Sequence, residues 1–360
     1  MKQPGLGIWS TIIVILLSAT VCAWFKPETF GTIFTVIAIA GIPAQVILGL
    51  VWQNNYPGVG GLSQPVKGIT LLLMQLIFTA IIAIWVLRGI GGGGPTPMAI
   101  FYMILSVPVA LWCVAVFQCW PASAMKAHPA FVGLVTLIII YIACTIIYYV
   151  GFNFQSTFGP APFYPAIAAL DPHGLFDAAK ALTFAVLTVA VILACILLDF
   201  WPITSMIPKM PALGKQPLFG IVAGIWVLII SYILWYIFIG AMGMDVMMFQ
   251  VKIAVCWIFG EFIMLVCLQT APFQTTKQPG KGIALIICSI ILAAIMWYLY
   301  AWLAVALNGA LPSGPPAYVL ELWVASAMLA VTFPMMNIYC GFFNSWPFSE
   351  AAPPPPPAGK

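Results

Sequence analysis

Charged residues are scarce in this 360-residue chain. Lys and Arg together number 12 and Asp and Glu number 8, so 6% of the residues are charged, whereas about 25% are charged in soluble domains. Hydrophobic residues make up 64% of the chain, more than a soluble fold can bury. The composition therefore excludes a soluble protein and indicates an integral membrane protein with the lipid bilayer as its environment. The net charge of +4 gives no reason to expect a nucleic-acid partner.

Several kinds of site are also missing. The two histidines, His128 and His173, lie outside the apolar runs, which excludes bis-histidine haem ligation inside the membrane. The chain has no Walker loop, no Gly-x-Ser-x-Gly and no Cys-x-x-Cys pair. Its nine cysteines lie inside apolar runs, where cysteine usually behaves as a small hydrophobe. We therefore expect no enzyme, no metal site, no cofactor and no disulfide framework.

Ten apolar runs are long enough to span a bilayer, which takes about 20 residues. They cover residues 6–25, 31–53, 68–87, 98–119, 129–151, 179–201, 219–240, 246–269, 282–307 and 318–343. Each must be a helix, because lipid offers no partner to an open strand edge. The sequence therefore predicts an all-α membrane protein with ten transmembrane helices.

A pair of signatures recurs along the chain and suggests five tandem copies of one two-helix hairpin. The openings are Gln3-Pro4, Gln64-Pro65, Gln216-Pro217, Gln278-Pro279 and the weaker His128-Pro129. Each copy closes with a polar residue three positions before a proline: Asn54, Gln118, Asp199, Gln269 and Asn344. The expected repeats are 1–57, 63–121, 127–202, 215–272 and 277–347, followed by a proline-rich tail at 348–360. The repeats share one orientation, and they would pack as a closed ring or as a less regular bundle.

The five closing polar residues have two interpretations. If they face a common axis, they form a polar collar near one membrane interface. If they do not, they satisfy carbonyls in the last turns of their helices, and each proline then ends its helix.

Lysine distribution predicts the orientation. Ten spans place both termini on one side, and lysines concentrate in the loops on that side, so the positive-inside rule puts both termini in the cytoplasm. We expect the membrane to be a prokaryotic plasma (inner) membrane.

Three copies carry a mid-span proline, namely Pro43, Pro108 and Pro334, which kinks a helix. The third copy instead has a long outer loop at 152–178, and the fourth carries Lys252 and Glu261 within its second helix. Copies that depart from the pattern are the better candidates for a specific function.

Lys252 and Glu261 are the clearest candidate site residues. A charge near the bilayer centre costs at least about 2.5–3.5 kcal/mol, so it usually faces a partner or a water-filled cavity. Nine residues of helix place the two side chains on opposite faces, so each needs a partner elsewhere, such as Asn337 or Gln45, or a cavity. Either Glu261 binds a proton, a cation or a polar group of a substrate, or it is a protonated packing residue while Lys252 extends to the interface.

Two functions fit these features. The first is a transporter or channel-like facilitator for a small neutral or weakly charged solute, with proton coupling at Glu261 as one form. The alternative is a non-catalytic membrane subunit or scaffold, with a homo-oligomer or other membrane subunits as partners. Convergence of Glu261, Asn337, Gln45 and Gln75 on a cavity would favour transport, whereas scattered polar residues and covered apolar faces would favour the scaffold.

Overall fold

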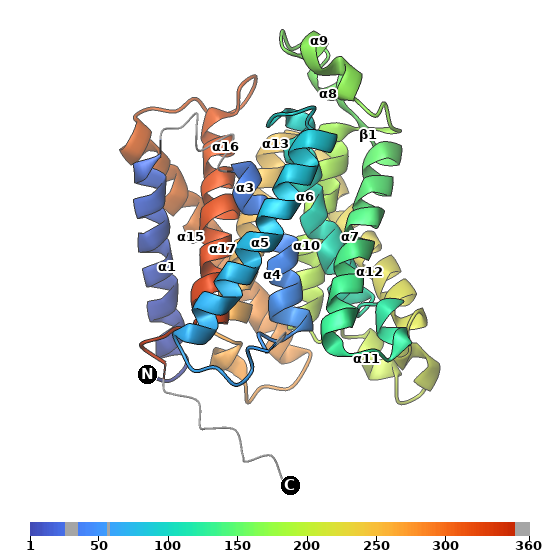
Figure 1. The fold of residues 1–360 in the computed structure, drawn as a ribbon, viewed down its shortest axis with the longest axis vertical. Helices are drawn as coiled ribbons and strands as arrows, with labels where there is room; N and C mark the ends of the chain where they lie inside the picture. Colours follow the sequence, from blue (N-terminus) through green and yellow to red (C-terminus); the bar gives the residue numbers. More distant parts are fainter. Residues whose placement is uncertain (26–34, 56–57, 350–360) are drawn as a thin grey trace.

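The computed structural model describes residues 1–25, 35–55 and 58–349 and is mostly helical (Figure 1). Within this described part, nine helices are long and apolar enough to cross a membrane. They are Gly5–Trp24, Val66–Gly89, Pro97–Val116, Pro129–Gly151, Ala178–Leu197, Leu218–Ala241, Val246–Cys267, Gly280–Asn308 and Val319–Phe342. A shorter apolar helix, Val36–Val51, corresponds to the expected span 31–53, whose first residues lie outside the described part. The prediction of a helical membrane protein is confirmed, and the count of ten stays a prediction.

Several spans are built from more than one helical segment. The α-helices are α1 (Gly5–Trp24), α3 (Thr35–Ala40), α4 (Ile42–Val46), α5 (Val66–Gly89), α6 (Pro97–Leu111), α7 (Pro129–Gly151), α8 (Phe154–Phe158), α9 (Tyr164–Ile167), α10 (Ala178–Leu197), α11 (Ile203–Met206), α12 (Leu218–Trp235), α13 (Val246–Phe249), α14 (Cys256–Phe262), α15 (Gly280–Asn308), α16 (Val319–Ser326) and α17 (Phe333–Met336). π-Helical turns cover Ile47–Val51, Trp112–Val116, Tyr236–Ala241, Gln250–Val255, Ile263–Cys267, Ala327–Thr332 and Asn337–Phe342. The two strands, β1 (Phe152–Asn153) and β2 (Phe176–Asp177), pair in parallel.

Five spans form a closed inner ring. We name them by their central helices: the α4 span (α3, α4 and the turn to Val51), the α6 span (Pro97–Val116), α10, the α14 span (Val246–Cys267) and the α17 span (Val319–Phe342). Each packs against the next in this order, and the α17 span packs against α3 to complete the ring. More than half of each long inner span is buried within the protein.

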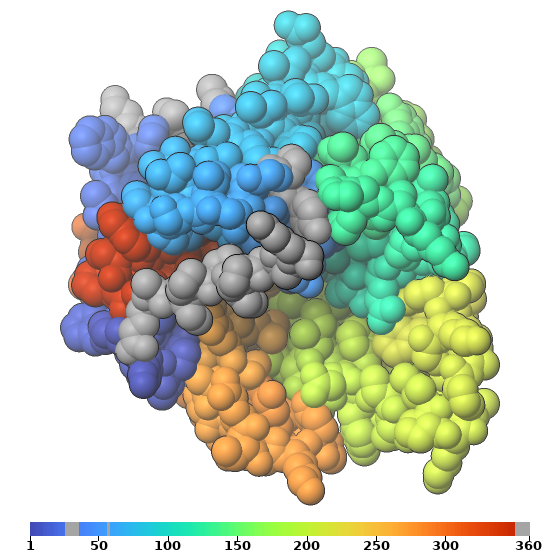
Figure 2. All heavy atoms as spheres, turned by 60° about the horizontal axis from the view of Figure 1, so that its bottom comes forward, coloured from blue at the N-terminus to red at the C-terminus, as the bar shows by residue number. Residues whose placement is uncertain are grey.

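The other five helices form an outer layer, and each packs between two neighbouring inner spans, with α15 also touching α16 and α5 also touching α6. In this arrangement α1 packs on the α14 and α17 spans, α5 on the α17 and α4 spans, α7 on the α4 and α6 spans, α12 on the α6 span and α10, and α15 on α10 and the α14 span. Only about a third of each outer helix is buried. Figure 2, seen from the face at which α1 begins, shows the first turns of α1, α5, α7, α12 and α15 distributed around the rim.

One hydrogen-bond pattern recurs where the outer helices begin. At four openings a glutamine side chain accepts from the backbone N–H four residues later and donates to a carbonyl at the end of an inner span. The donor–acceptor pairs are Gln3 Nε2 to Cys267 O at 2.9 Å, Gln64 Nε2 to Phe342 O at 2.7 Å, Gln216 Nε2 to Val116 O at 3.0 Å and Gln278 Nε2 to Leu197 O at 2.9 Å. The N–H groups belong to Gly7, Gly68, Gly220 and Gly282.

Glycine is needed at these positions because the inner span lies too close for a side chain. A Cβ on Gly68, for example, would overlap the ring of Phe343. The fifth opening uses different residues for a similar contact. There Trp52 Nε1 donates to Pro129 O at 3.0 Å, and a Cβ on Gly133 would overlap the Trp52 indole.

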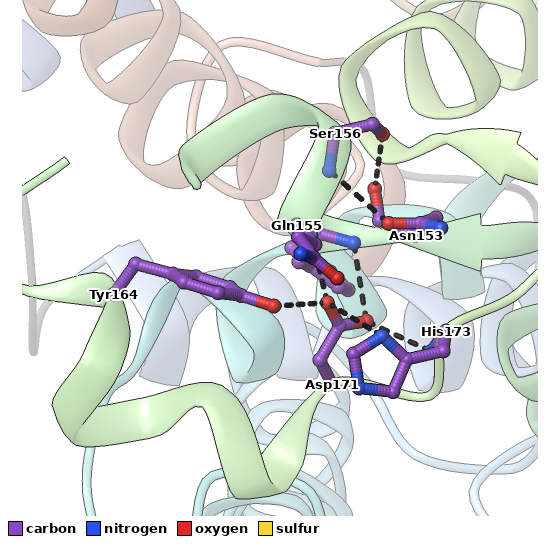
Figure 3. Close-up of polar contacts among 7 residues, drawn as sticks. Asn153, Gln155, Ser156, Tyr164, Asp171 and His173 are labelled. Carbon is purple, nitrogen blue, oxygen red and sulfur yellow. Dashed lines mark hydrogen bonds and ion pairs between the residues drawn. The ribbon is translucent and has the colours of Figure 1, made fainter. Parts of the chain in front are cut away.

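Residues 152–177 form a folded cap between α7 and α10, and Figure 1 shows its α8 and α9 projecting beyond the bundle. Its centre is the buried carboxylate of Asp171 (Figure 3). This side chain accepts hydrogen bonds from the backbone N–H groups of Phe154 (3.1 Å), Gln155 (2.7 Å) and His173 (2.9 Å) and from the Tyr164 hydroxyl (2.6 Å). A single carboxylate therefore joins three parts of the predicted outer loop.

These hydrogen bonds change the ionisation of the cap. Burial opposes ionisation of Asp171, but the bonds from Tyr164 and the three backbone N–H groups outweigh it, so the Asp171 pKa lies below its usual value. Burial, together with the negative charge of Asp171, raises the pKa of Tyr164 to about 12.

Candidate functional site

A small cavity of about 30 Å³ lies where the five inner spans meet. Every inner span contributes to its lining: Ile39 and Ile42; Ile104, Val107, Pro108 and Leu111; Val186 and Val189; Ile258 and Phe262; Leu329 and Phe333. All these side chains are apolar. A space of this size could hold about one water molecule, but water is retained in a protein only where polar partners are present. The axis of the ring is therefore a dry constriction.

Two phenylalanines narrow this axis. Phe262 of α14 and Phe333 of α17 meet with ring centroids 4.3 Å apart and an interplanar angle of 67°. Such edge-to-face contacts are favourable. Because the rings belong to adjacent inner spans, a relative movement of α14 and α17 would change the width of the axis.

Three of the predicted site residues come together beside the ring. Gln45 Nε2 donates to Gln75 Oε1 at 3.1 Å and to Pro334 O at 3.3 Å, and Gln45 Oε1 accepts from Asn337 Nδ2 at 3.4 Å. Gly41 makes this approach feasible, because a Cβ there would lie 3.0 Å from Gln75 Nε2. The network joins α4, α5 and the α17 span, and these residues are absent from the lining of the axial cavity.

Glu261 lies apart from that network and is likewise absent from the lining of the axial cavity, so the four residues do not converge on a cavity. Its side chain is 0% exposed, and neither carboxyl oxygen has a hydrogen-bond partner among the described residues. Gly260 holds α14 tightly against α15, because a Cβ there would overlap the Ser289 carbonyl. The Ser289 hydroxyl already accepts from Trp257 Nε1 and donates to Ile286 O. Glu261 is thus a buried carboxyl group directly next in sequence to Phe262.

Lys252 finds a partner that the sequence interpretation did not name. Its Nζ lies 3.6 Å from Glu321 Oε1 and 4.8 Å above the centre of the Trp297 ring. Glu321 is fully buried and also accepts from the Ser313 hydroxyl and from Gly314 N–H. The expected partners Asn337 and Gln45 are therefore wrong for Lys252, since they pair with each other. Glu321 went unnoticed because it lies three residues into its expected span, where an acid looks like an interfacial residue.

The five closing polar residues follow the inner spans, and all have a positive φ: Asn54, Gln118, Asp199, Gln269 and Asn344. Side-chain hydrogen bonds are present for two of them, from Asn54 Nδ2 to Gly341 O at 3.3 Å and from Gln278 Nε2 to Asp199 Oδ2 at 2.8 Å. After the α4 span the first of two consecutive positive-φ residues is Gln53 rather than Asn54, whereas after the other four inner spans it is the closing residue itself: Gln118, Asp199, Gln269 or Asn344. Left-handed residues of this kind end helices, so the geometry gives these positions a part in chain reversal.

No protein-family model, curated protein or solved structure matches this chain.

Proposed function

We propose that this protein is a transporter or channel-like facilitator that moves a small neutral or weakly charged solute along the axis of the inner ring. The observation that carries the proposal is the axial cavity, whose lining comes from all five inner spans. A closed ring of helices leaves one central route that every helix can widen or narrow. The contact between Phe262 and Phe333 is the gate in this proposal, and the described structure is its closed state.

The tandem-repeat interpretation belongs to the same proposal. Each outer helix begins against an inner span contributed two copies earlier around a ring of five, as with Gln64 on Phe342 and Gln216 on Val116. This rule applies equally to Gln3 and Gln278. Five parallel hairpins that interlock by one rule produce an approximately fivefold axis, in the manner of parallel membrane repeats.

The lining indicates the class of solute. An apolar wall cannot replace the hydration shell of a fully charged ion, and hydrophobic constrictions exclude ions by dewetting. A small molecule that is uncharged, or that loses its charge on binding a proton, crosses such a constriction at a much lower cost.

Glu261 is the proton-binding group in this proposal. It is a buried carboxyl group for which the described residues provide no hydrogen-bond partner, and it adjoins the gate residue Phe262. Cys195 of α10 is a titratable side chain beside it, and α15 presents the engaged Ser289 hydroxyl. Ionisation of Glu261 in this packing requires water or a cation, so a change in its protonation state would loosen α14 against α10 and α15.

The test is flux into liposomes that contain the purified protein, for a panel of small neutral solutes and weak acids. At least one solute should enter faster than it enters protein-free liposomes, with a rate that depends on pH. Glu261→Gln should remove the pH dependence. If no member of the panel enters faster than in protein-free liposomes, the proposal fails.

The scaffold alternative has its own supporting observation. Apolar grooves of about 590 and 650 Å³ lie between outer helices, one beside α7 and α12 and the other between α5 and α7. Lipid or other membrane subunits could cover these grooves. Native mass spectrometry of the gently solubilised protein separates the two functions, because a scaffold carries stoichiometric partner proteins and a stand-alone transporter does not.

A further inference from the structure

Two thiols meet at the ends of adjacent inner spans. Cys267 ends the α14 span and Cys340 lies in the last turn of the α17 span, and their Sγ atoms are 3.5 Å apart. Both residues are buried, with 2% and 6% of their surfaces exposed. Sulfur atoms in a disulfide are about 2.05 Å apart, so an approach of about 1.5 Å would join them.

We infer that Cys267 and Cys340 form a reversible disulfide that fastens the α14 span to the α17 span, with hydrogen peroxide or a related peroxide as the oxidant. This pairing goes beyond the expectation that all nine cysteines act only as small hydrophobes. Seven other cysteines are present, and all nine are free thiols in the structure.

The surroundings of the pair favour this chemistry. The hydroxyls of Ser10 and Ser345 bond each other at 2.9 Å and lie beside Cys340, and Thr11 lies beside Cys267. The Ser345 hydroxyl accepts from Ser10, so its own hydrogen can be donated to a Cys340 thiolate, the form of cysteine that reacts with peroxides, whereas the Thr11 hydroxyl donates to the Gly7 carbonyl. The pair lies at the ends of two inner spans, on the face at which α1 begins, since the Cys267 carbonyl accepts from Gln3.

The oxidation balances in two steps. One thiolate attacks a peroxide oxygen, so that an S–O bond forms, the O–O bond breaks, and the leaving hydroxide takes up the thiol proton as water. The other thiol then attacks the resulting sulfenic acid, so that the S–S bond forms, the S–O bond breaks and a second water leaves. The two sulfur atoms lose two electrons and the peroxide gains them. A dithiol reductant reverses the result by thiol–disulfide exchange.

The effect on the axis follows from the positions of the two residues. Cys267 is five residues beyond Phe262 and Cys340 is seven beyond Phe333, so the disulfide would join the two spans that carry the gate. In its regulatory part the inference depends on the proposed function: oxidation would hold the axis closed and reduction would release it.

The test begins with disulfide mapping in membranes. The full-length protein is treated with hydrogen peroxide, the remaining thiols are alkylated, and peptides are analysed by mass spectrometry. The expected product is a cross-linked peptide that contains Cys267 and Cys340, with two fewer alkylated thiols and full reversal by a dithiol. Cys22→Ser, which removes a buried thiol outside the pair, should form the same product, whereas Cys267→Ser and Cys340→Ala should not. Full alkylation of both residues after peroxide treatment would overturn the inference.

Two further readouts separate this inference from the proposed function. A cross-link between distant residues should raise the unfolding temperature of the wild type and of Cys22→Ser but not of the pair variants, whether or not the protein transports anything. Flux should fall on oxidation and recover on reduction only where both cysteines are present. A mapped disulfide that leaves measurable flux unchanged would overturn the regulatory part. A mapped disulfide in a protein without flux would contradict the proposed function and leave the disulfide established.

Discussion

Gln45 and Glu261 occupy matching places in two inner spans but have opposite environments. Each lies eight residues before the first positive-φ residue after its span, Gln53 for one and Gln269 for the other. Gln45 has hydrogen-bond partners on α5 and the α17 span. Glu261 has none among the described residues. The same place in an inner span can therefore hold a side chain that links neighbouring helices or one that is available for ionisation. Which of these applies depends on the hydrogen-bonding groups of the adjacent helices.

The difference arises in the neighbouring helices. The outer helix beside Gln45 supplies Gln75, eleven residues after its opening glutamine, whereas the outer helix beside Glu261 supplies Ser289 at that distance. Ser289 is already engaged by Trp257 and Ile286. The polar groups beside Gln45 satisfy one another, which is how buried polar groups normally persist. Glu261 departs from that rule, and buried groups that do so are candidates for function.

The largest effect on stability should come from Gln45→Leu. The change leaves the buried Gln75 side chain and the Pro334 carbonyl without Gln45, while the half-buried Asn337 keeps its bond to the Phe333 carbonyl. Each unsatisfied buried group costs about 1–3 kcal/mol. Thermal unfolding in detergent should show a clear loss of stability. The matched control is Gln269→Leu at an exposed span end, where we expect no loss. An unchanged unfolding temperature for Gln45→Leu would show that the network contributes nothing.

Glu261→Leu should change the stability in the opposite direction to Gln45→Leu. Replacing a buried, unpaired carboxyl group with an apolar side chain of similar size should be neutral or stabilising, by up to about 1–3 kcal/mol, while pH-dependent flux disappears. The same unfolding experiment measures stability, and liposome flux measures function. A destabilisation as large as that of Gln45→Leu would mean that Glu261 has a hydrogen-bond partner. The environments of Gln45 and Glu261 would then not differ.

Loss of the ion pair between Lys252 and Glu321 should lower the stability by a smaller amount. Lys252→Met leaves Glu321 with its hydrogen bonds from Ser313 and Gly314, and the lysine side chain is 24% exposed, so the loss should stay below about 1 kcal/mol. Glu321→Met should cost more, because it leaves both donors and the lysine without their shared acceptor. The reverse order would contradict the assignment of Glu321 as the organising group.

The smallest expected effect is on the local stability of the cap, residues 152–177. The pKa of Asp171 is lower in the folded protein than its unfolded value of about 3.9. Its contribution to stability is therefore present above that unfolded value and is lost as pH falls through the folded pKa. Hydrogen-exchange protection of residues 152–177, taken relative to the intrinsic exchange rate at each pH, should fall in acid for the wild type, while in Asp171→Asn it should already be low at neutral pH. Protection that is identical in the two proteins at neutral pH would contradict this role.

The sequence predicted those features that depend on local patterns. Apolar runs predicted the membrane spans, and the proline- and aromatic-rich segment at 152–178 was expected as a loop and is the folded cap. The Gln-Pro pairs indicated where the expected hairpins open, but their contact with the ends of inner spans joins residues as far apart as Gln3 and Cys267. No local pattern encodes such a partner.

In the candidate site too, the sequence revealed residues with a local signal but not the contacts between distant segments. Hydropathy identified Lys252 and Glu261, because a charge inside an apolar run is conspicuous. Phe262 and Phe333 went unnoticed, since phenylalanine within a membrane helix carries no signal until the ring shows which residues face its axis. The transport hypothesis grouped Gln45, Gln75 and Asn337 with Glu261 around a cavity, whereas the three pair with one another away from Glu261. The pairing of Lys252 with Glu321 required the packing of α16 against the start of the α14 span.

The most direct test of the axial route is the flux of a small neutral solute through Phe262→Ala and Phe333→Ala, singly and together. Phe131→Ala is the matched control, because Phe131 lies exposed on the outer helix α7. If the axis is the route and the two rings close it, each axial variant should raise flux above that of the wild type, the double variant most of all, while the control leaves it unchanged. Flux in the axial variants equal to that of the wild type and Phe131→Ala would contradict a route through the centre of the ring.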